Sequence, residues 1–255
     1  ESFGGALRSQ ILPELEANGI FLLSNRNLSP TQESFFRDRF QSQVRPHLEP
    51  HVLADESDPI FLEDGRIYLV TELWPESDIG LGSEGPVYGI LKLPSAPLPR
   101  FMVVPGVGHS VLFLEDVIRL SIAEVFPEYE VGSAFAVKLT RDADLYLDDE
   151  FEGDLKEKIE KSLGKRDTGV PSRFLYDLQA PYALVSFMKR HLGLEDDDLV
   201  PGGRYHNLQD FLQFPRPRNT DHLVRSRLEP LPHPGLHGEP SIMEAVIRKD
   251  RLLHF

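Results

Sequence analysis

The chain has 255 residues, a net charge of −14 at pH 7 and a hydrophobic content of 40%. This length fits one domain at the upper end of the usual size, or a main domain with appendages, and the apolar content suffices for a sizeable core. The negative charge gives no general electrostatic support to binding nucleic acid or an anionic membrane. Because there is no cysteine, disulfides, thiol chemistry and thiolate metal sites are excluded, which fits a reducing cytosol.

Targeting signals are missing from the sequence. It has no apolar run of about 18 residues and no basic and apolar signal segment at its start. The first residue is Glu1 rather than Met, so we expect a processed, cut or partial product.

The first part of the chain predicts two helices and a short strand. The apolar spacing of residues 11–17 predicts a helix that ends at Asn18 and Gly19, and a strand should follow over Ile20–Leu23. Ser29 is expected to cap a second helix, with Pro30 in its first turn. The buried side of this helix should carry Phe35, Phe36 and Phe40.

Two histidines, His47 and His51, stand four residues apart, a spacing that suits a metal site on a helix. Pro46 and Pro50 disfavour a helix at this point. We therefore interpret the segment as a proline-rich connector without a metal site.

The next segment predicts two hairpins and a helix. Strands are expected over residues 66–73 and 87–93, joined by a long loop, and over 101–104 and 110–113. An amphipathic helix should follow at residues 114–126.

Residues 135–139 alternate between large apolar side chains and smaller or charged ones, which predicts an internal strand. This strand would present Arg141 between Asp142 and Asp144 at its end, where α/β proteins often bind ligands. The alternative is that Arg141 is a locally paired structural charge. The carboxylates at residues 148–150, followed by an apolar series spaced by four, predict an acidic helix over residues 151–163.

The loop GKRDTG at residues 164–169 superficially suggests a phosphate cradle. A P-loop needs a strand before it and a helix after it, whereas here a helix precedes and a strand follows, so we reject that interpretation. A strand over 172–178 and a helix over 181–192, ended by Gly193, complete the pattern. The succession predicts an α+β fold of layered α/β type, a mixed β-sheet with packed helices, N-terminal helices and a Pro-rich C-terminal linker.

The segment GGRYHN at residues 202–207 places many hydrogen-bond donors on one loop. Backbone amides freed by the glycines, helped by Arg204, could receive a phosphate. The alternative is a solvated turn whose Tyr205 packs against the sheet.

From Phe214 onward the sequence is dense in Pro, Gly and His, which predicts an extended linker. His233 and His237 are separated by Pro234 and Gly235, so a preformed metal pair is not expected. Ser241 should cap a last helix over residues 242–249, whose apolar face suggests the opening of a further domain.

Motifs for nucleophilic or metal-dependent hydrolysis are absent from the sequence: it has no G-x-S-x-G, no H-E-x-x-H and no EF-hand loop. Carboxylate pairs such as Asp142 with Asp144, or Asp148 with Asp149, could in principle perform acid–base work. Solvated charge is the default interpretation of such pairs.

Several stretches resemble, in order, the middle or head domain of bacterial polyphosphate kinase of the phosphohistidine-forming type. The specific matches are TRDAD in the central segment and IRKDRLLHF at the end of the chain. The weaker matches are VRPHLEPHVLAD, LKLPSAPLPRFMVVP and FLEDVIRLSIAEVFP. The chain departs from the family where HLEP replaces an expected LTP, and where GILKLPSAP lacks a tight Lys-Val-Pro. These departures affect the expected geometry of local loops more than the resemblance to the family.

The resemblance implies a domain plan. Residues 1–45 would form an N-terminal helical segment that joins a missing N-terminal domain, and residues 46–213 the middle α/β domain. Residues 214–240 would be the linker, and residues 241–255 the first helix of a truncated C-terminal catalytic domain.

The resemblance also implies a reaction: the full enzyme reversibly transfers the terminal phosphoryl group of ATP to polyphosphate through a phosphohistidine, with Mg²⁺. The phosphorylated histidine and the ATP and Mg²⁺ contacts would lie in flanking segments, and His254 matches a structural position. No catalytic, cofactor-binding or metal-binding residue is therefore assigned here, and the fragment alone should be inactive. The resemblance implies a homo-oligomer, either a dimer or a tetramer, with no nucleic-acid partner. The protein would be located in the cytoplasm, or peripherally at the inner membrane.

The implied role of this part is to support dimer contacts and to frame a polyphosphate channel. Such a channel needs basic side chains to match phosphate charge. The candidates are Lys92, Arg100, Lys138, Arg141, Arg173 and Arg204. Two other hypotheses remain open: a stand-alone binding or scaffolding module with no enzymatic parent, and a small-molecule hydrolase that uses Asp142 or Asp144.

Overall fold

The computed structural model describes residues 2–53, 60–75, 85–104, 108–142, 170–218, 220–226, 228–229, 236 and 240–249. The chain divides into two compact units, Glu1–Pro215 and Arg216–Phe255. The acidic helix, the GKRDTG loop, Asp144, His233, His237 and His254 lie outside the described residues.

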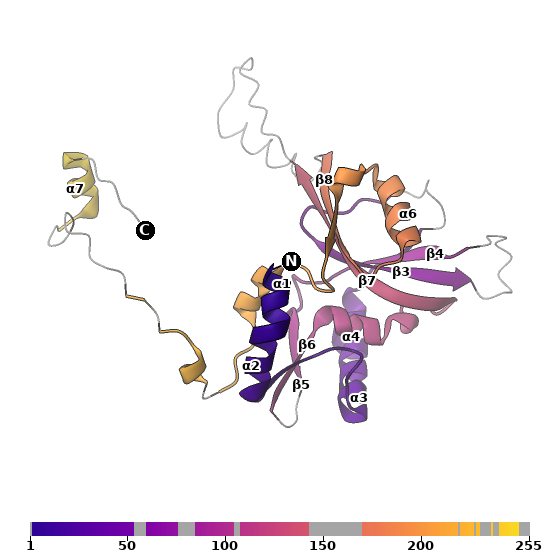
Figure 1. Cartoon of the computed structure of the whole chain (residues 1–255), viewed down its shortest axis with the longest axis horizontal. Helices are drawn as coiled ribbons and strands as arrows, with labels where there is room; N and C mark the ends of the chain where they lie inside the picture. The colour runs from indigo at the N-terminus through magenta and orange to yellow at the C-terminus, as the bar shows by residue number, and fades with distance from the viewer. Residues whose placement is uncertain are drawn as a thin grey trace, which may run out of the picture. The chain divides into compact units, whose positions relative to one another are not determined.

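The first unit is built around a six-stranded sheet with the strand order β2-β4-β3-β7-β8-β9 (Figure 1). Neighbouring strands are antiparallel except β8 and β9, which run parallel. The longest strand, β7, spans 14 residues and pairs with β3 on one side and β8 on the other. The bounds are β2 Pro50–Leu53, β3 Ile67–Pro75, β4 Val87–Lys92, β7 Tyr129–Asp142, β8 Val170–Asp177 and β9 Leu199–Gly202.

A second, smaller sheet has the order β1-β6-β5. Strand β1 runs parallel to β6, and β5 forms an antiparallel hairpin with β6. The bounds are β1 Ile20–Leu23, β5 Phe101–Val104 and β6 His109–Phe113.

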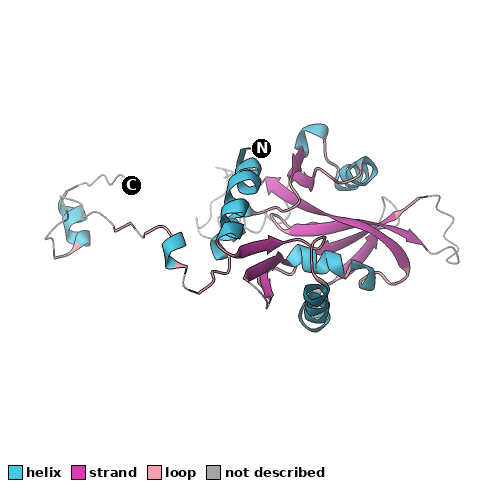
Figure 2. Cartoon of the chain, turned by 60° about the horizontal axis from the view of Figure 1, so that its bottom comes forward, coloured by secondary structure: helices cyan, strands magenta, loops and turns pink. Residues whose placement is uncertain are grey.

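Helices lie on both sides of the large sheet (Figure 2). Those of the first unit are α1 Ser2–Ala6, continued by a π-helical stretch Leu7–Ile11 and by α2 Leu12–Ala17, then α3 Pro30–Arg39, α4 Leu114–Leu120 and α6 Tyr182–Leu192. The remaining helical segments of the first unit are short. They are a π-helical stretch Phe40–Val44 and the 3₁₀ turns Arg45–His47, Ile122–Glu124, Asp196–Asp198 and Leu208–Gln213. The second unit contains a 3₁₀ turn Asp221–Leu223 and α7 Ile242–Arg248. No helix in the described part is long and apolar enough to cross a bilayer.

The two faces of the large sheet bury separate hydrophobic clusters, because side chains alternate along a strand. One face packs against α3 and α4, through residues such as Phe36, Ile118 and Ala136. The opposite face packs against α6, through Val137 and Met188 among others. This arrangement confirms the predicted α+β fold with a mixed sheet and packed helices.

Local signals predicted several element ends correctly. The Ser29 hydroxyl accepts a hydrogen bond from the Gln32 amide, and the Gln32 side chain accepts one from the Ser29 amide, at 3.3 and 2.9 Å. Gly193 ends α6 with φ of 66°, a left-handed conformation in which glycine is favoured. Both predicted hairpins are present, and the Ser241 side chain caps α7.

Two predicted bounds were wrong. The helix expected to reach residue 126 ends at Leu120, because Ser121 donates its amide to Ile118 O and the chain tightens into a 3₁₀ turn before β7. Strand β7 begins at Tyr129, ahead of the alternating residues, because β3 pairs with it along that extension.

The proline-rich connector is more ordered than expected. Pro46 lies in a 3₁₀ turn, and Pro50 opens the edge strand β2, a position that proline tolerates. His47 and His51 therefore belong to different elements.

Strands β3 and β7 approach closely near one end of their pairing. The register shifts between Thr71 and Leu73, and a Cβ at Gly132 would stand 2.8 Å from the Trp74 ring. Trp74 is 39% exposed and is the single tryptophan of the sequence. Glycine is therefore required at residue 132 for the indole to lie across β7.

Candidate functional site

Residues 204–214, which we call the strap, follow β9 and end the first unit. Three aromatic side chains hold the strap on the small sheet. The Tyr205 ring stacks on Phe113 with 4.0 Å between ring centroids, and the rings of Phe211 and Phe214 lie 5.3 and 5.2 Å from that of Phe101. The strap thus covers a third hydrophobic cluster, centred on Phe101, Val111 and Phe113.

Under the strap lie two adjacent carboxylates, Glu115 and Asp116, in the first turn of α4. Both are fully buried, at 0% exposure. A helix start favours negative charge, but burial of a carboxylate is costly unless cations and donors surround it.

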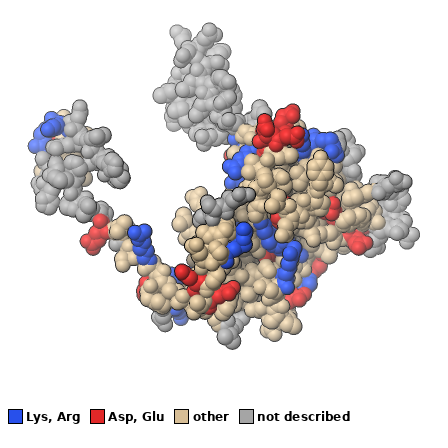
Figure 3. Space-filling model, in the orientation of Figure 1, with Lys and Arg blue, Asp and Glu red and all other residues tan. Residues whose placement is uncertain are grey.

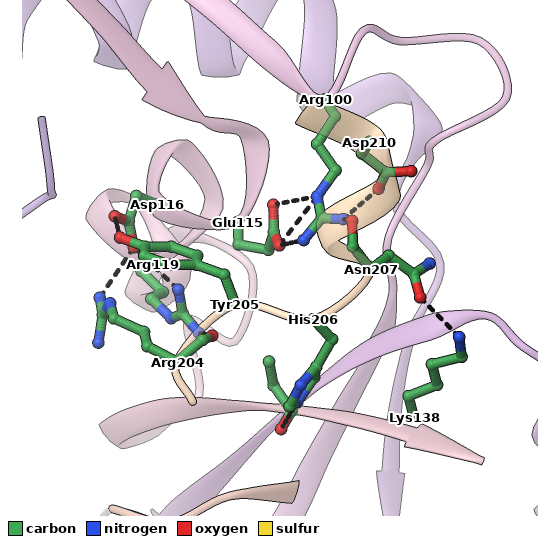
Figure 4. Close-up of polar contacts among 11 residues, drawn as sticks. Arg100, Glu115, Asp116, Arg119, Lys138, Arg204, Tyr205, His206, Asn207 and Asp210 are labelled. Carbon is green, nitrogen blue, oxygen red and sulfur yellow. Dashed lines mark hydrogen bonds and ion pairs between the residues drawn. The ribbon is translucent and has the colours of Figure 1, made fainter. Parts of the chain in front are cut away.

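Glu115 pairs with Arg100, which also reaches the strap (Figure 4). The Arg100 Nε donates to both Glu115 oxygens, at 3.1 and 3.2 Å, and its guanidinium also binds Asp210. Burial alone would lower the pKa of Arg100, but Glu115 and Asp210 outweigh it and raise that pKa above its usual value. Arg100 therefore ties α4 to the strap as a permanent cation.

Asp116 is the centre of a second group. Its Oδ1 accepts from Arg119 and Arg204, both at 2.8 Å, and its Oδ2 accepts from the Tyr205 hydroxyl at 2.6 Å. Arg204 also donates to Asn25 Oδ1 at 2.7 Å. Burial first, and then the nearby Asp116, raise the pKa of Tyr205, so the phenol stays protonated and acts as a donor.

The next two strap residues contact β7. His206 is 3% exposed and lies with Nε2 at 2.9 Å from Ala136 O, and burial lowers the pKa of its imidazole. Asn207 adopts a left-handed φ of 55° and accepts a hydrogen bond from Lys138 Nζ at 2.6 Å. The segment GGRYHN is therefore neither a solvated turn nor an open donor loop, although Tyr205 does pack, as one interpretation expected.

The predicted basic candidates are not gathered into one site. Arg100 and Arg204 lie in the buried network, and Lys92 pairs with Glu63. The Arg141 guanidinium lies 4.5 Å from the Phe61 ring, while the Arg141 amide donates to Asp64 Oδ1 at 2.7 Å. Its predicted position between Asp142 and Asp144 stays a prediction.

Lys138 and Arg173 lie together on one face of the large sheet, next to a pocket of about 200 Å³. Polar side chains predominate in the lining of this pocket: Arg66, Ser95, Arg100, Asn207, Asp210 and Gln213. Such a lining can hold a small polar or charged group by hydrogen bonds.

Sequence reasoning missed Glu115, Asp116 and Asp210. A signal was present for the first two, because both stand in the first turn of a helix whose other side chains are mostly apolar. In the described part of the chain, no three His, Asp or Glu side chains are grouped so that they could hold a metal ion. The described residues thus provide no cage of protein ligands for a divalent cation.

Comparison with known proteins places the chain. Residues 31–214 match the family model of the polyphosphate kinase middle domain. The chain belongs to the polyphosphate kinase family. It is 31% identical to the polyphosphate kinase of Vibrio parahaemolyticus over 98% of this chain and 36% of that relative. It is 33% identical to the Escherichia coli polyphosphate kinase over 91% of this chain and 34% of the relative.

The fold agrees with this family. The crystal structure of polyphosphate kinase from Porphyromonas gingivalis superimposes with a TM-score of 0.71 at 31% identity. That match covers 94% of this chain and 34% of the other. The chain thus spans about a third of the length of the polyphosphate kinases it matches.

Proposed function

We propose that this chain is the middle domain of an enzyme that reversibly transfers the terminal phosphoryl group of ATP to polyphosphate through a phosphohistidine. The match of residues 31–214 to the polyphosphate kinase middle domain carries this proposal. Because the chain spans about a third of its relatives, we assign ATP, Mg²⁺ and the phosphorylated histidine to flanking segments.

We further propose that this domain braces the enzyme and is inactive alone. The buried carboxylates support such a role, since Glu115 and Asp116 are held by arginines and a tyrosine. Both carboxylates are fully buried and their oxygens are occupied by these partners, so neither is placed to reach a substrate. A divalent metal would also find no group of three ligands in the described residues.

The same proposal includes dimer or tetramer contacts and a channel for polyphosphate. It also includes a cytoplasmic location, with or without attachment to the inner membrane. The candidate cations divide by environment. Arg100 and Arg204 serve the internal network, whereas Lys138 and Arg173 are not ion-paired in the part of the chain described. This difference favours the second pair as channel residues.

A synthesis assay tests the proposal. The 255-residue chain is compared with the natural protein extended at both ends, each incubated with ATP and Mg²⁺, and polyphosphate is measured by gel staining. We expect product only from the extended protein. Polyphosphate formation by the chain alone would disprove the bracing role, and an extended protein with no synthesis would disprove the kinase assignment. A stand-alone module would lack the histidine-bearing extension altogether.

A further inference from the structure

Two basic side chains of the first unit, Lys138 and Arg173, are unlike the other candidates in their surroundings. Lys92, Arg100 and Arg204 each form an ion pair with a carboxylate. Lys138 has a neutral partner, the Asn207 amide oxygen, and among the described residues neither Lys138 nor Arg173 has a carboxylate within ion-pair distance. In a chain with 41 acidic and 27 basic residues, two neighbouring cations without such partners indicate a use for their charge.

The sheet fixes these two residues as neighbours. Arg173 on β8 pairs in register with Thr140 on β7, and Lys138 lies two positions before Thr140. Side chains two apart on a strand share a face, so Lys138 and Arg173 are diagonal neighbours on the same face. Lys138 is half-buried, whereas Arg173 is exposed. A ligand that contacts both would therefore lie across β7 and β8.

The polar pocket extends from this position. Ile67, which lines the pocket, pairs in register with Lys138, and Asn207, another lining residue, binds the lysine. Donors in the lining include Arg66, Ser95 and Gln213, and the one carboxylate in it, Asp210, is bound by Arg100. The volume of about 200 Å³ admits one or two phosphate-sized groups.

The charged groups that act most strongly on Lys138 are Asp64, Asp210, Arg173 and Arg100. Arg100 is already paired with Asp210 and Glu115, so of the two arginines Arg173 is the one outside the buried network. Burial, with Arg173 and Arg100, lowers the pKa of Lys138 in spite of the two carboxylates. An anion close to Nζ would stabilise this ammonium.

We infer that Lys138 and Arg173, together with the pocket beside them, form a binding site for the oxyanions of a condensed phosphate chain. The identity of the ligand rests on the proposed function, whereas the position of the site rests on the two cations and the pocket. Charge-assisted hydrogen bonds from Lys138 and Arg173 would hold adjacent phosphate units, with the pocket donors taking the next. Figure 3 shows that, in this view, Lys and Arg side chains are interspersed with Asp and Glu over the surface of the first unit.

The test is calorimetric titration of the 255-residue chain with tripolyphosphate, and separately with orthophosphate and with ATP. We expect tripolyphosphate to bind more tightly than orthophosphate. The variant Lys138→Gln/Arg173→Gln should weaken tripolyphosphate binding by about tenfold or more, and Lys138→Arg/Arg173→Lys should retain most of it. ATP binding tighter than that of tripolyphosphate would assign the site to a nucleotide instead and overturn the inference.

A matched control removes the same charge elsewhere. In the double variant Lys189→Gln/Arg190→Gln, both substitutions are on α6, which covers the opposite face of the sheet. Its affinity for tripolyphosphate should stay within about twofold of that of the parent chain. Equal weakening by both variants would show a general charge effect and overturn the inference, as would no weakening by the first. Unfolding curves of each variant establish that it is folded. Because the readout is binding by the chain, failure of the kinase assignment in the extended protein would be a separate result.

Discussion

Asp116 lies in the first turn of α4, yet its partner Arg204 stands 88 residues further along the chain. A carboxylate with no exposure is stable only while these partners remain, so each contact of the group depends on the others. Because of these contacts, a substitution of Arg204 cannot report on its own whether this residue lines a polyphosphate channel. A charge change there would disturb Asp116, Tyr205 and Asn25 before it altered any ligand.

Replacement of Asp116 by asparagine should lower the free energy of unfolding by about 3–5 kcal/mol, because it leaves Arg119 and Arg204 without their buried anion. Urea unfolding followed by circular dichroism measures this change. Asp197→Asn, at an exposed position of the 3₁₀ turn after α6, is the control and should stay within about 0.5 kcal/mol. Equal stabilities of the two variants would contradict the role of the network.

His206 predicts how stability depends on pH. Burial lowers the pKa of its imidazole below the usual 6.5, so the unfolded chain binds the proton more readily than the folded one. The contribution of His206 is therefore complete above pH 6.5 and is lost as the pH falls from there toward the lowered pKa. Unfolding experiments at several pH values should show a shallower fall below pH 6.5 for His206→Gln than for the parent. The same slope for both proteins would argue against this assignment.

At the scale of elements, the sequence predicts what depends on neighbours along the chain. The capping signals of Ser29 and Gly193 identified helix ends, and alternation identified the hairpins, because those interactions are local. The strap was not predictable in this way. Its charges look like those of a solvated loop until α4 supplies the matching carboxylates, and this pairing exists only in the folded chain. The early start of β7 likewise depends on β3 rather than on its own pattern.

The end of α6 offers a test of local conformation. Gly193→Ala should lower stability by about 1 kcal/mol, because a Cβ is unfavourable at φ of 66° even though nothing lies within 4 Å of it. Gly203→Ala also meets no atom within 4 Å and does not have a positive φ, so it should be nearly neutral. Thermal unfolding compares the two. A larger loss for residue 203 would refute the conformational explanation.

At the scale of the whole molecule, the three hydrophobic clusters of the first unit are composed of residues up to Phe214. His109 Nε2 donates to Pro215 O at 2.6 Å at the last residue of this unit. Among the described residues, the members of these clusters therefore pack against one another within the first unit. The strap is the last piece of that core, although its composition had assigned Phe214 to the linker.

Truncation tests this division. A chain that ends at Pro215 should unfold with the same free energy as the full chain, within about 1 kcal/mol. A chain that ends at Gly203 should be strongly destabilised or fail to fold, because it lacks Tyr205, Phe211 and Phe214 and leaves Asp116 with only Arg119. Chemical denaturation of both products gives the comparison. Similar stability of the two truncated chains would show that the strap is dispensable.

The indole of Trp74 makes one end of the central strand pair visible to optical spectroscopy. It is the sole tryptophan fluorophore, it rests over Gly132, and the stretch from residue 216 onward carries none. Emission excited selectively from this ring will therefore follow the separation of β3 from β7 and will contain no tryptophan signal from the C-terminal forty residues.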